Sequence, residues 1–576
     1  MCKQDHCALV LSVLGLVVGC NAPAAPTDGS SAMTDAPRLD TALPHADTGV
    51  PDIDTGTAVP DTGGTVITPD MPGPSDVRFA IDSTSHAVPI SPYIYGLNAP
   101  NWSDASGATI TRFGGNRITA YNWENNASNA GSDYLFENDN FLCSDAGCTA
   151  PGETVRRVIS AAQAHGSASL IAIPMAGYVS ADTGPGGDVR GSANYLTTRF
   201  HPISFHKPSA FSLTPNLTDG VVYEDEFVNW IETTFPASRA TPSHAVFYEL
   251  DNEPDLWSST HAEIHPSPVT YAEMATQSVA LATAIKRVAP DALVFGFVSY
   301  GWAGYANLQS APDAMGRDFI DFFLDNMHSA ESTAGHRLLD VLDLHWYPEA
   351  TGAGTRIIED SANAAIIAAR LQAPRSLWDS TYTETSWITG CCSGGPIRLI
   401  PRLMDQIAAH YPGTRLGFSE YNYGGATQIS GGIAEADVLG IFGREGVFQA
   451  TEWPTSGSEP YIVGGLRMYR NYDGAGATFG NVSISATTSD SAQSSVYASI
   501  DAGHPERMVV VAINKTGSMQ RAGIAVTHTT RFSVAHVYTL TSAGAMPVHG
   551  TDVPITARNA FVYAMPPMSV TTLVLQ

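Results

Sequence analysis

The chain is poor in positive charge, and this shortage excludes a whole class of partner. Its 576 residues include 29 lysines and arginines against 56 aspartates and glutamates, a formal net charge of −27 at pH 7. Such a chain repels polyanions and anionic membrane surfaces, so we expect no nucleic-acid partner. Hydrophobic residues still make up 44% of the sequence, which is typical of a folded protein with a large core.

Long hydrophobic runs are also missing, except near the N-terminus. Residues 8–19, ALVLSVLGLVVG, are apolar, follow the positive charge of Lys3 and are too short to span a bilayer. The run is followed by Cys20 in VVGC, which resembles a bacterial lipobox, in which the cysteine is lipidated. An ordinary signal peptide with a chance cysteine is the alternative. We expect residues 1–19 to be a lipoprotein signal peptide.

This leader predicts that the protein is exported. Lipid on Cys20 would anchor the protein to the bacterial outer membrane or cell surface. Release of the protein into the medium is the alternative expectation. Residues 20–75 contain no aromatic residue and no hydrophobic period, and are rich in Asp, Thr and Pro. Such a composition predicts a disordered linker that holds the folded part away from the anchor.

Cysteine is scarce, with seven in the whole chain. Beyond Cys20 only Cys143, Cys148, Cys391 and Cys392 remain, an even number in an exported protein, which makes disulfides plausible. The first two would close a small loop, whereas a bond between the adjacent pair would be strained. The connectivity stays open at this level. No CxxC pair or suitable histidine spacing accompanies these cysteines, which disfavours a zinc site there.

From residue 93 onward, short apolar runs alternate with stretches of helical period. Eight such units predict a (β/α)8 barrel over residues 93–482, within the α/β class. The strand-like runs begin at Tyr93, Ala108, Ala168, Ala245, Ala292, Leu339, Thr414 and Val447. Helical signals then disappear, and residues 483–576 consist of short alternating strands that predict an additional β-sandwich domain. An early strand within residues 76–92 is expected to join that sandwich.

Two glutamates mark the expected mouth of the barrel. Function in this fold resides at the C-terminal ends of the strands. The fourth strand ends in ELDNEP and the seventh in SEYNYGG, which places Glu253 and Glu420 across the mouth from each other. Glycoside hydrolysis requires two facing carboxyl groups. Each residue has a structural alternative when taken alone: Glu253 as a loop acid, and Glu420 as a member of an ion pair at the strand end. Their joint placement at the strand ends favours catalysis.

Other acids compete with this pair. Glu249 lies deeper in the fourth strand and suits an ion pair inside the barrel, and period-two alternation places Asp251 on the same side as Glu253. Glu384 lies in a long loop after the sixth strand, where it would be at most a subsite residue.

Tryptophans follow many of the strand ends, as expected for a cleft that binds polysaccharide. Sugar rings stack their apolar faces on indole rings, although some of these tryptophans are expected to pack beneath loops instead. Polar side chains in the strand ends RFGGNR and DLHWYPE are further candidates for binding the sugar. The substrate-binding candidates are Trp123, Trp302, Trp387, Trp453, Asn116 and His345.

Several longer motifs together resemble glycoside hydrolase family 44. They include DNEPDLW, DVLDLHWYPEA, and SEYNYGG followed by ISGGIAEADVLGIFGREGV and MYRNYDG. The resemblance implies β-1,4-endoglucanase or xyloglucanase activity on a barrel with a β-sandwich, with retention of configuration. It implies that Glu253 is the acid/base and Glu420 the nucleophile. It also implies that Asn252 contacts the sugar 2-hydroxyl and that Tyr347 hydrogen-bonds Glu420. The adjacent cysteines and the CSDAGC loop depart from the family pattern.

The resemblance implies no cofactor for catalysis, but it does imply a structural calcium ion. In NLTDGVVYEDEF, Asp219 and Asp225 offer hard oxygen ligands, whereas a capped helix start is the alternative interpretation. The expected partner is a β-1,4-glucan, and a monomer is expected. Two other functions share these features: a non-catalytic surface glycan-binding protein, and a transglycosylase with the same catalytic residues.

Overall fold

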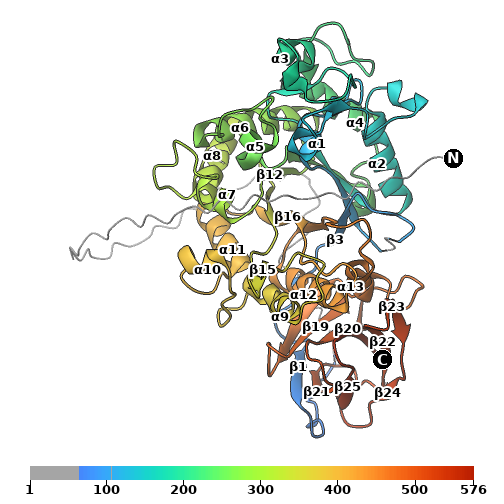
Figure 1. Cartoon of the computed structure of the whole chain (residues 1–576). Helices are drawn as coiled ribbons and strands as arrows, with labels where there is room; N and C mark the ends of the chain where they lie inside the picture. Colours follow the sequence, from blue (N-terminus) through green and yellow to red (C-terminus); the bar gives the residue numbers. More distant parts are fainter. Residues whose placement is uncertain (1–63, 105–106) are drawn as a thin grey trace, which may run out of the picture.

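The computed structural model describes residues 64–104 and 107–576, which form two packed domains. Figure 1 shows the parallel barrel in the upper part of the view and the antiparallel strands of the C-terminal domain below it. The predicted signal peptide, Cys20 and most of the predicted linker lie outside the described residues. No helix in the described part of the chain is long and apolar enough to cross a membrane.

Eight parallel strands close into a barrel, and every strand predicted from the sequence takes part. In sequence order they are β3 (Tyr93–Asn98), β4 (Ile110–Phe113), β7 (Ala168–Ile173), β11 (Val246–Leu250), β12 (Val294–Ser299), β13 (Val341–Trp346), β16 (Arg415–Tyr421) and β17 (Gln449–Glu452). The near-continuous burial of these strands explains their apolar runs, because both faces of a parallel barrel strand are covered. The predicted (β/α)8 architecture is confirmed.

Helices surround the barrel. Those of eight residues or more are α2 (Glu153–Ala164), α4 (Glu224–Thr234), α6 (Tyr271–Val288), α8 (Phe319–Ala334), α9 (Ala364–Gln372), α11 (Leu399–His410), α12 (Ile429–Glu445) and α13 (Pro460–Arg470). Helix α6 begins with a capping box between Thr270 and Glu273, which satisfies exposed amides of its first turn.

An aromatic cluster fills the N-terminal end of the barrel. Tyr93 packs edge-on against Phe247, with ring centroids 5.0 Å apart, and Phe295 and Phe448 complete the group. These residues form a hydrophobic cluster separate from the main core. Because apolar rings close this end, polar chemistry is confined to the opposite end of the strands.

The second domain is an 11-stranded, mostly antiparallel sheet that folds over its own hydrophobic core. Its strands are β1 (Val77–Asp82), β2 (Val88–Pro89), β18 (Val482–Thr488), β19 (Ser494–Asp501), β20 (His504–Asn514), β21 (Gln520–Thr527), β22 (Val534–Thr541), β23 (Gly544–His549), β24 (Val553–Pro554), β25 (Ala560–Met565) and β26 (Ser569–Leu575). Strand β1 lies between β18 and β21, so the described part of the chain passes through this domain before it enters the barrel.

Part of the predicted linker is ordered, which corrects the prediction of disorder up to residue 75. The backbone amide of Ile67 donates to the carbonyl of His528 at 2.8 Å, and Asp70 pairs with Arg558 at 2.9 Å. Residues 64–75 therefore lie against the sandwich. Isolated apolar residues such as Ile67 carry no periodic signal, so composition alone did not reveal this contact.

Helices α12 and α13 join the two domains. The hydroxyl of Tyr497 on β19 donates to Asp437 on α12 at 2.6 Å, and Lys515 reaches the same carboxylate at 2.6 Å. Gly440 leaves room for the ring of Tyr497, whose Cδ2 would lie 2.3 Å from a Cβ at that position. Buried charged contacts and close packing thus fix the sandwich to the barrel.

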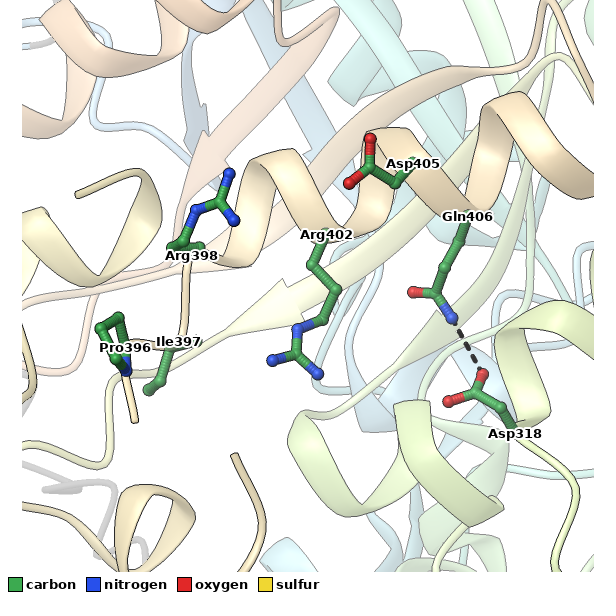
Figure 2. A pocket seen from close by; sticks show the side chains of 7 residues that line it. All are labelled: Asp318, Pro396, Ile397, Arg398, Arg402, Asp405 and Gln406. Atoms are coloured by element: carbon green, nitrogen blue, oxygen red, sulfur yellow. Dashed lines mark hydrogen bonds between the residues drawn. The ribbon is translucent and has the colours of Figure 1, made fainter. Parts of the chain in front are cut away.

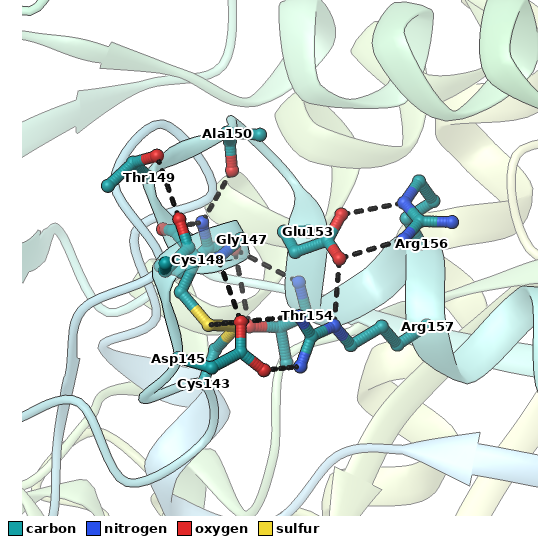
Figure 3. The surroundings of a disulfide bond; sticks show 12 residues. Cys143, Asp145, Gly147, Cys148, Thr149, Ala150, Glu153, Thr154, Arg156 and Arg157 are labelled. Carbon is teal, nitrogen blue, oxygen red and sulfur yellow. Dashed lines mark hydrogen bonds and ion pairs between the residues drawn. A yellow bond between two sulfur atoms is a disulfide. The ribbon is translucent and has the colours of Figure 1, made fainter.

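The four remaining cysteines form two disulfides, Cys143–Cys148 and Cys391–Cys392. The first closes the CSDAGC loop beside the N-terminus of α2 (Figure 3). Arg157 ties this loop to the helix, because its guanidinium pairs with Asp145 at 2.7 Å and with Glu153 at 2.8 Å. The adjacent cysteines bond at the end of the short helix α10 (Trp387–Cys391).

Candidate active site

A sharp turn aims Glu253 from the end of β11. The strand stops at Leu250, and Asp251 and Glu253 both adopt left-handed backbone angles, with φ of 62° and 43°. The amide of Glu253 donates to the carbonyl of Val298 at 3.0 Å, and Pro254 starts a 3-10 helix with its preset φ. The abrupt end of the apolar run therefore corresponds to a turn that is held at both ends.

Glu420 lies within β16 and shares a histidine with Glu253. The pairing of β13 with β16 shifts register at His345, so that His345 lies opposite Glu420. Its Nδ1 is 2.9 Å from Glu253 Oε1 and 3.4 Å from Glu420 Oε2. One oxygen of each carboxylate and a ring nitrogen of His345 all lie within 4.8 Å of one another. The structure thus brings together the two glutamates singled out from the sequence.

Arg112 organises the site from β4, and the sequence prediction missed it. Its Nη1 donates to Glu420 at 2.6 Å, its Nε to Glu249 at 2.8 Å, and its Nη2 to the amide oxygen of Asn252 at 2.8 Å. The side chains of Arg112 and Glu249 are fully buried, which agrees with the interior ion pair expected for Glu249. The motif RFGGNR contained the signal, because an arginine in a barrel strand needs buried acidic partners.

Tyr347 supplies a second donor to Glu420. Its hydroxyl donates to Oε2 at 2.7 Å, while Arg112 binds Oε1. Arg356 donates to the carbonyls of Tyr347 and Pro348, which fixes the backbone that carries the phenol. Each oxygen of Glu420 therefore has its own donor, an arrangement that favours the ionised carboxylate.

The environments of the two glutamates differ in charge. Burial raises the pKa of Glu253 to about 7, opposed by the charge of Arg112 and assisted by Asp133. Burial also raises the pKa of Glu420, while the charge of Arg112 and the Tyr347 hydrogen bond oppose the rise. The pKa of buried His345 falls to about 4, so at neutral pH its imidazole is uncharged and Arg112 carries the nearby positive charge.

The competing acids have structural partners. The alternation of side chains along β11 ends at Leu250, so Asp251 and Glu253 do not lie on one face as predicted. The carboxylate of Asp251 accepts hydrogen bonds from Thr119 at 2.6 Å and from the backbone amides of Met175 and Ala176. Glu384 is buried and accepts a hydrogen bond from Ser376 at 2.6 Å, rather than lining the surface.

Trp123 is not a substrate-binding residue, which corrects the sequence prediction. It is 1% exposed, stacks on Phe227 with ring centroids 5.6 Å apart, and makes a tilted contact with Trp230. Its position after a strand end suggested the cleft, but the following loop folds back beneath α4. Such a reversal depends on tertiary packing that a strand-end pattern does not report.

The other predicted tryptophans occupy three different settings. Trp453 lies over Gly115, where a Cβ would come within 2.6 Å of its ring. Trp387 is 45% exposed on α10. Trp302 stacks against the guanidinium of Arg402 and lines a small pocket next to a larger one of about 420 Å³. Figure 2 shows the larger pocket between α11 and the start of α8, with Gln406 bonded to Asp318.

Asn116 begins the short helix α1 (Asn116–Thr119) beside the mouth of the barrel. Its amide donates to Asp133 at 3.0 Å, and its backbone carbonyl contacts Nε2 of buried His261 at 2.7 Å. Because the charge of Asp133 acts on Glu253, this pair belongs to the surroundings of that acid. Its contact with substrate stays a prediction.

The two predicted calcium ligands differ in exposure, since Asp219 is exposed and Asp225 is buried. Asp225 is buried and binds Arg287, while its oxygens also accept from the amide of Lys207 at 3.0 Å. Arg287 already balances the charge of Asp225, and the role of Asp225 as a calcium ligand stays a prediction. Asp219 instead contributes to the surroundings of Glu124, whose pKa is raised to about 8 by burial and then by the charges of Asp219 and Glu226.

The fold and the paired glutamates at the barrel mouth together define a glycoside hydrolase. Comparison with known proteins gives the family. The model of glycoside hydrolase family 44 matches residues 127–350. Endoglucanase A of Paenibacillus lautus is 41% identical over 524 residues, which cover 87% of this chain and 73% of that protein. The chain belongs to glycoside hydrolase family 44.

Solved structures agree with this assignment. A family 44 xyloglucanase of Paenibacillus polymyxa, solved with xyloglucan, has a TM-score of 0.83 and 39% identity and covers 87% of this chain and 99% of its own. A family 44 endoglucanase of Clostridium thermocellum has a TM-score of 0.83 and 41% identity, with 87% and 100% coverage.

Proposed function

We propose that this chain is a retaining, endo-acting hydrolase of β-1,4-glucan backbones, including cellulose-type glucans and xyloglucan. The observation that carries the proposal is the spacing of the two glutamates, with one oxygen of each within 4.8 Å of the other. Retaining enzymes hold their carboxyl groups about 5–5.5 Å apart, whereas inverting enzymes need about 6.5–9.5 Å to admit a water molecule. Relatives described as an endoglucanase and a xyloglucanase support the substrate class.

In the first step Glu420 attacks the anomeric carbon and Glu253 protonates the departing oxygen. Glu420 suits the nucleophile because Arg112 and Tyr347 donate to its two oxygens and favour its charge. Glu253 suits the acid because burial raises its pKa to about 7, which keeps it protonated in weakly acidic solution. The bond from the anomeric carbon to the leaving oxygen breaks as the ester to Glu420 forms.

In the second step water hydrolyses the glycosyl ester, with Glu253 as the base. Loss of its proton in the first step prepares Glu253 to accept one from water. A contact between Asn252 and the sugar is supported by Arg112, which holds the Asn252 amide oxygen and leaves the NH2 group to donate. We assign this NH2 group to the sugar 2-hydroxyl, where hydrogen bonding strengthens in the transition state.

A leaving-group comparison tests the roles directly. Glu253→Ala should slow hydrolysis of xyloglucan by at least about a thousandfold, but the glycosylation of an aryl cellobioside with a good leaving group much less. Azide should restore turnover of the aryl substrate by attacking the ester in place of water. Asp251→Asn, which alters a neighbouring acid with structural partners, is the control and should show no azide effect. Equal losses on both substrates without rescue would reject Glu253 as the acid/base.

We also infer a structural calcium site in which Glu124 accompanies Asp219. Glu124 is 5% exposed, and within the described residues no side-chain or backbone donor bonds its carboxylate. Burial and nearby negative charge raise its pKa, and a hard cation would offset both. Calcium should therefore raise the Tm of the wild type but not of Glu124→Gln. An equal calcium effect on both proteins would remove Glu124 from the site.

We propose further that the protein is an exported lipoprotein with Cys20 as the lipidated residue. The proposal rests on the apolar run before VVGC. Labelled palmitate should be incorporated into the protein expressed in a bacterial host, and Cys20→Ala should abolish the labelling. Persistent labelling of the variant would contradict it.

A further inference from the structure

Three ligating side chains meet on the sandwich, apart from the catalytic centre. His536, His549 and Asp552 each offer one ligand atom, and these atoms lie within 4.8 Å of one another. Nδ1 of His536 is 2.8 Å from Asp552 Oδ2, and Nε2 of His549 is 3.2 Å from Asp552 Oδ1. Asp552 Oδ1 also accepts from the amide of Val537 at 3.3 Å. All three side chains keep contact with solvent.

The strand register brings these residues together. Tyr538 of β22 pairs with His549 of β23, and Ala535 pairs with Val553 of β24. The chain between these pairs leaves the sheet after His549 and returns at Val553, which sets Asp552 opposite His536. His536 and Tyr538 are two residues apart on one strand and so share a face with His549.

Their chemistry and spacing match a transition-metal site. We propose that His536, His549 and Asp552 bind one divalent ion of the zinc class, with water in the fourth position. Zinc bonds of about 2.0–2.2 Å place the ligands of a tetrahedral ion about 3.3–3.6 Å apart. The two printed contacts of Asp552, at 2.8 and 3.2 Å, are slightly shorter. Imidazole nitrogen suits zinc, copper and nickel, whereas calcium takes oxygen ligands.

The site would fasten the edge of the sheet. Strand β23 is the outermost strand beside β22, and most of its residues are at least partly exposed. Strand β23 also packs closely against α13. A Cβ at Gly464 of α13 would lie 2.6 Å from the carbonyl oxygen of Ala545 on β23, and Arg467 of α13 contacts Met546 of β23. A metal that links β22, β23 and the following loop would hold this cover against α13 and stabilise the native state.

Zinc titration of matched variants tests the proposal. All proteins are full length and carry Glu420→Gln, because Glu253, His345 and Glu420 form a second group able to hold a metal. After treatment with a chelator and return to calcium-containing buffer, zinc chloride is titrated by calorimetry. The background protein should bind about one equivalent more than its His549→Ala and Asp552→Asn derivatives. His504→Ala, which alters another exposed strand histidine beside an acid, is the control and should match the background.

Two further readouts separate a built site from weak surface binding. Cobalt should give the visible absorption of a four-coordinate ion in the background and control proteins, and lose it in the His549 and Asp552 variants. Zinc should raise the Tm of the first two proteins only. Equal zinc stoichiometry and equal Tm shifts in His549→Ala and His504→Ala would overturn the proposal, whether or not the enzyme hydrolyses glucan.

Discussion

At the residue scale, the two carboxylates differ because their partners differ. Glu420 receives a hydrogen-bond donor on each oxygen, from Arg112 and Tyr347. Glu253 instead contacts the uncharged ring of His345, and its side chain is largely removed from water. In the mechanism that we propose, the same type of side chain therefore serves as an anion at Glu420 and as an acid at Glu253.

The rate should depend on the protonation of Glu253. Because burial raises its pKa to about 7, kcat/KM on xyloglucan should fall about tenfold per unit above that pH, as Glu253 loses its proton. A pH profile of initial rates measures this. The slow residual reaction of Glu253→Gln should lack the alkaline fall, since an amide does not titrate. An unchanged alkaline limb in that variant would assign the limb to another group.

Tyr347 should contribute through its hydrogen bond to the nucleophile. Tyr347→Phe removes one of the two donors to Glu420, and a hydrogen bond to a charged group is worth about 1.5–3 kcal/mol. The expected loss in kcat is about 10–150-fold. Tyr461→Phe, which removes a hydroxyl bonded to the carbonyl of Thr541, is the control and should leave kcat unchanged. Equal kcat values for both variants would exclude a role in charge stabilisation.

At the element scale, the strand ends explain which residues the sequence revealed. Glu253 and Glu420 were found because parallel strands bring their C-terminal ends to one face, so sequence position predicts spatial position. Arg112 was missed because its role depends on three buried partners, Glu249 and Glu420 on two other strands and Asn252 in the turn after one of them. Trp123 was misassigned because the direction of a loop after a strand depends on long-range packing.

Two tryptophans should separate packing from binding. Trp123→Ala should lower the free energy of unfolding by about 3–5 kcal/mol, because its ring is buried against Phe227 and Trp230. Trp387→Ala should change it by less than about 0.5 kcal/mol, since that ring is exposed, yet weaken retention in a xyloglucan gel. Urea unfolding and affinity electrophoresis measure the two effects. A stable Trp123→Ala protein with weakened glucan binding would restore the original assignment.

At the scale of the whole molecule, the barrel lies in sequence between two segments that fold into one sandwich. Strand β1 pairs with β18 and β21, strands that lie beyond the barrel in sequence. The two-domain division was predictable because the helical period stops near residue 482. The contact of residues 64–75 with the sandwich was not predictable, because these residues carry no periodic pattern.

Two deletions should locate the boundary of the folded enzyme. Removal of residues 21–63 should leave the Tm and the activity on short substrates unchanged. Removal of residues 21–75 should lower the Tm, because it deletes the backbone bond from Ile67 to His528 and the pairing of Asp70 with Arg558. Differential scanning calorimetry of the two proteins provides the comparison. Identical Tm values would mean that the segment adds nothing to stability.

The central claim is that Glu420 forms the covalent bond to the sugar while Glu253 moves the proton. An activated 2-deoxy-2-fluoro cello-oligosaccharide, which slows hydrolysis of the ester, tests this most directly when the labelled protein is digested and sequenced by mass spectrometry. The account predicts one glycosyl group per chain, attached to Glu420, and none in Glu420→Gln. A label on Glu253 or another residue, or no label together with an inverted anomer as the first product, would contradict it.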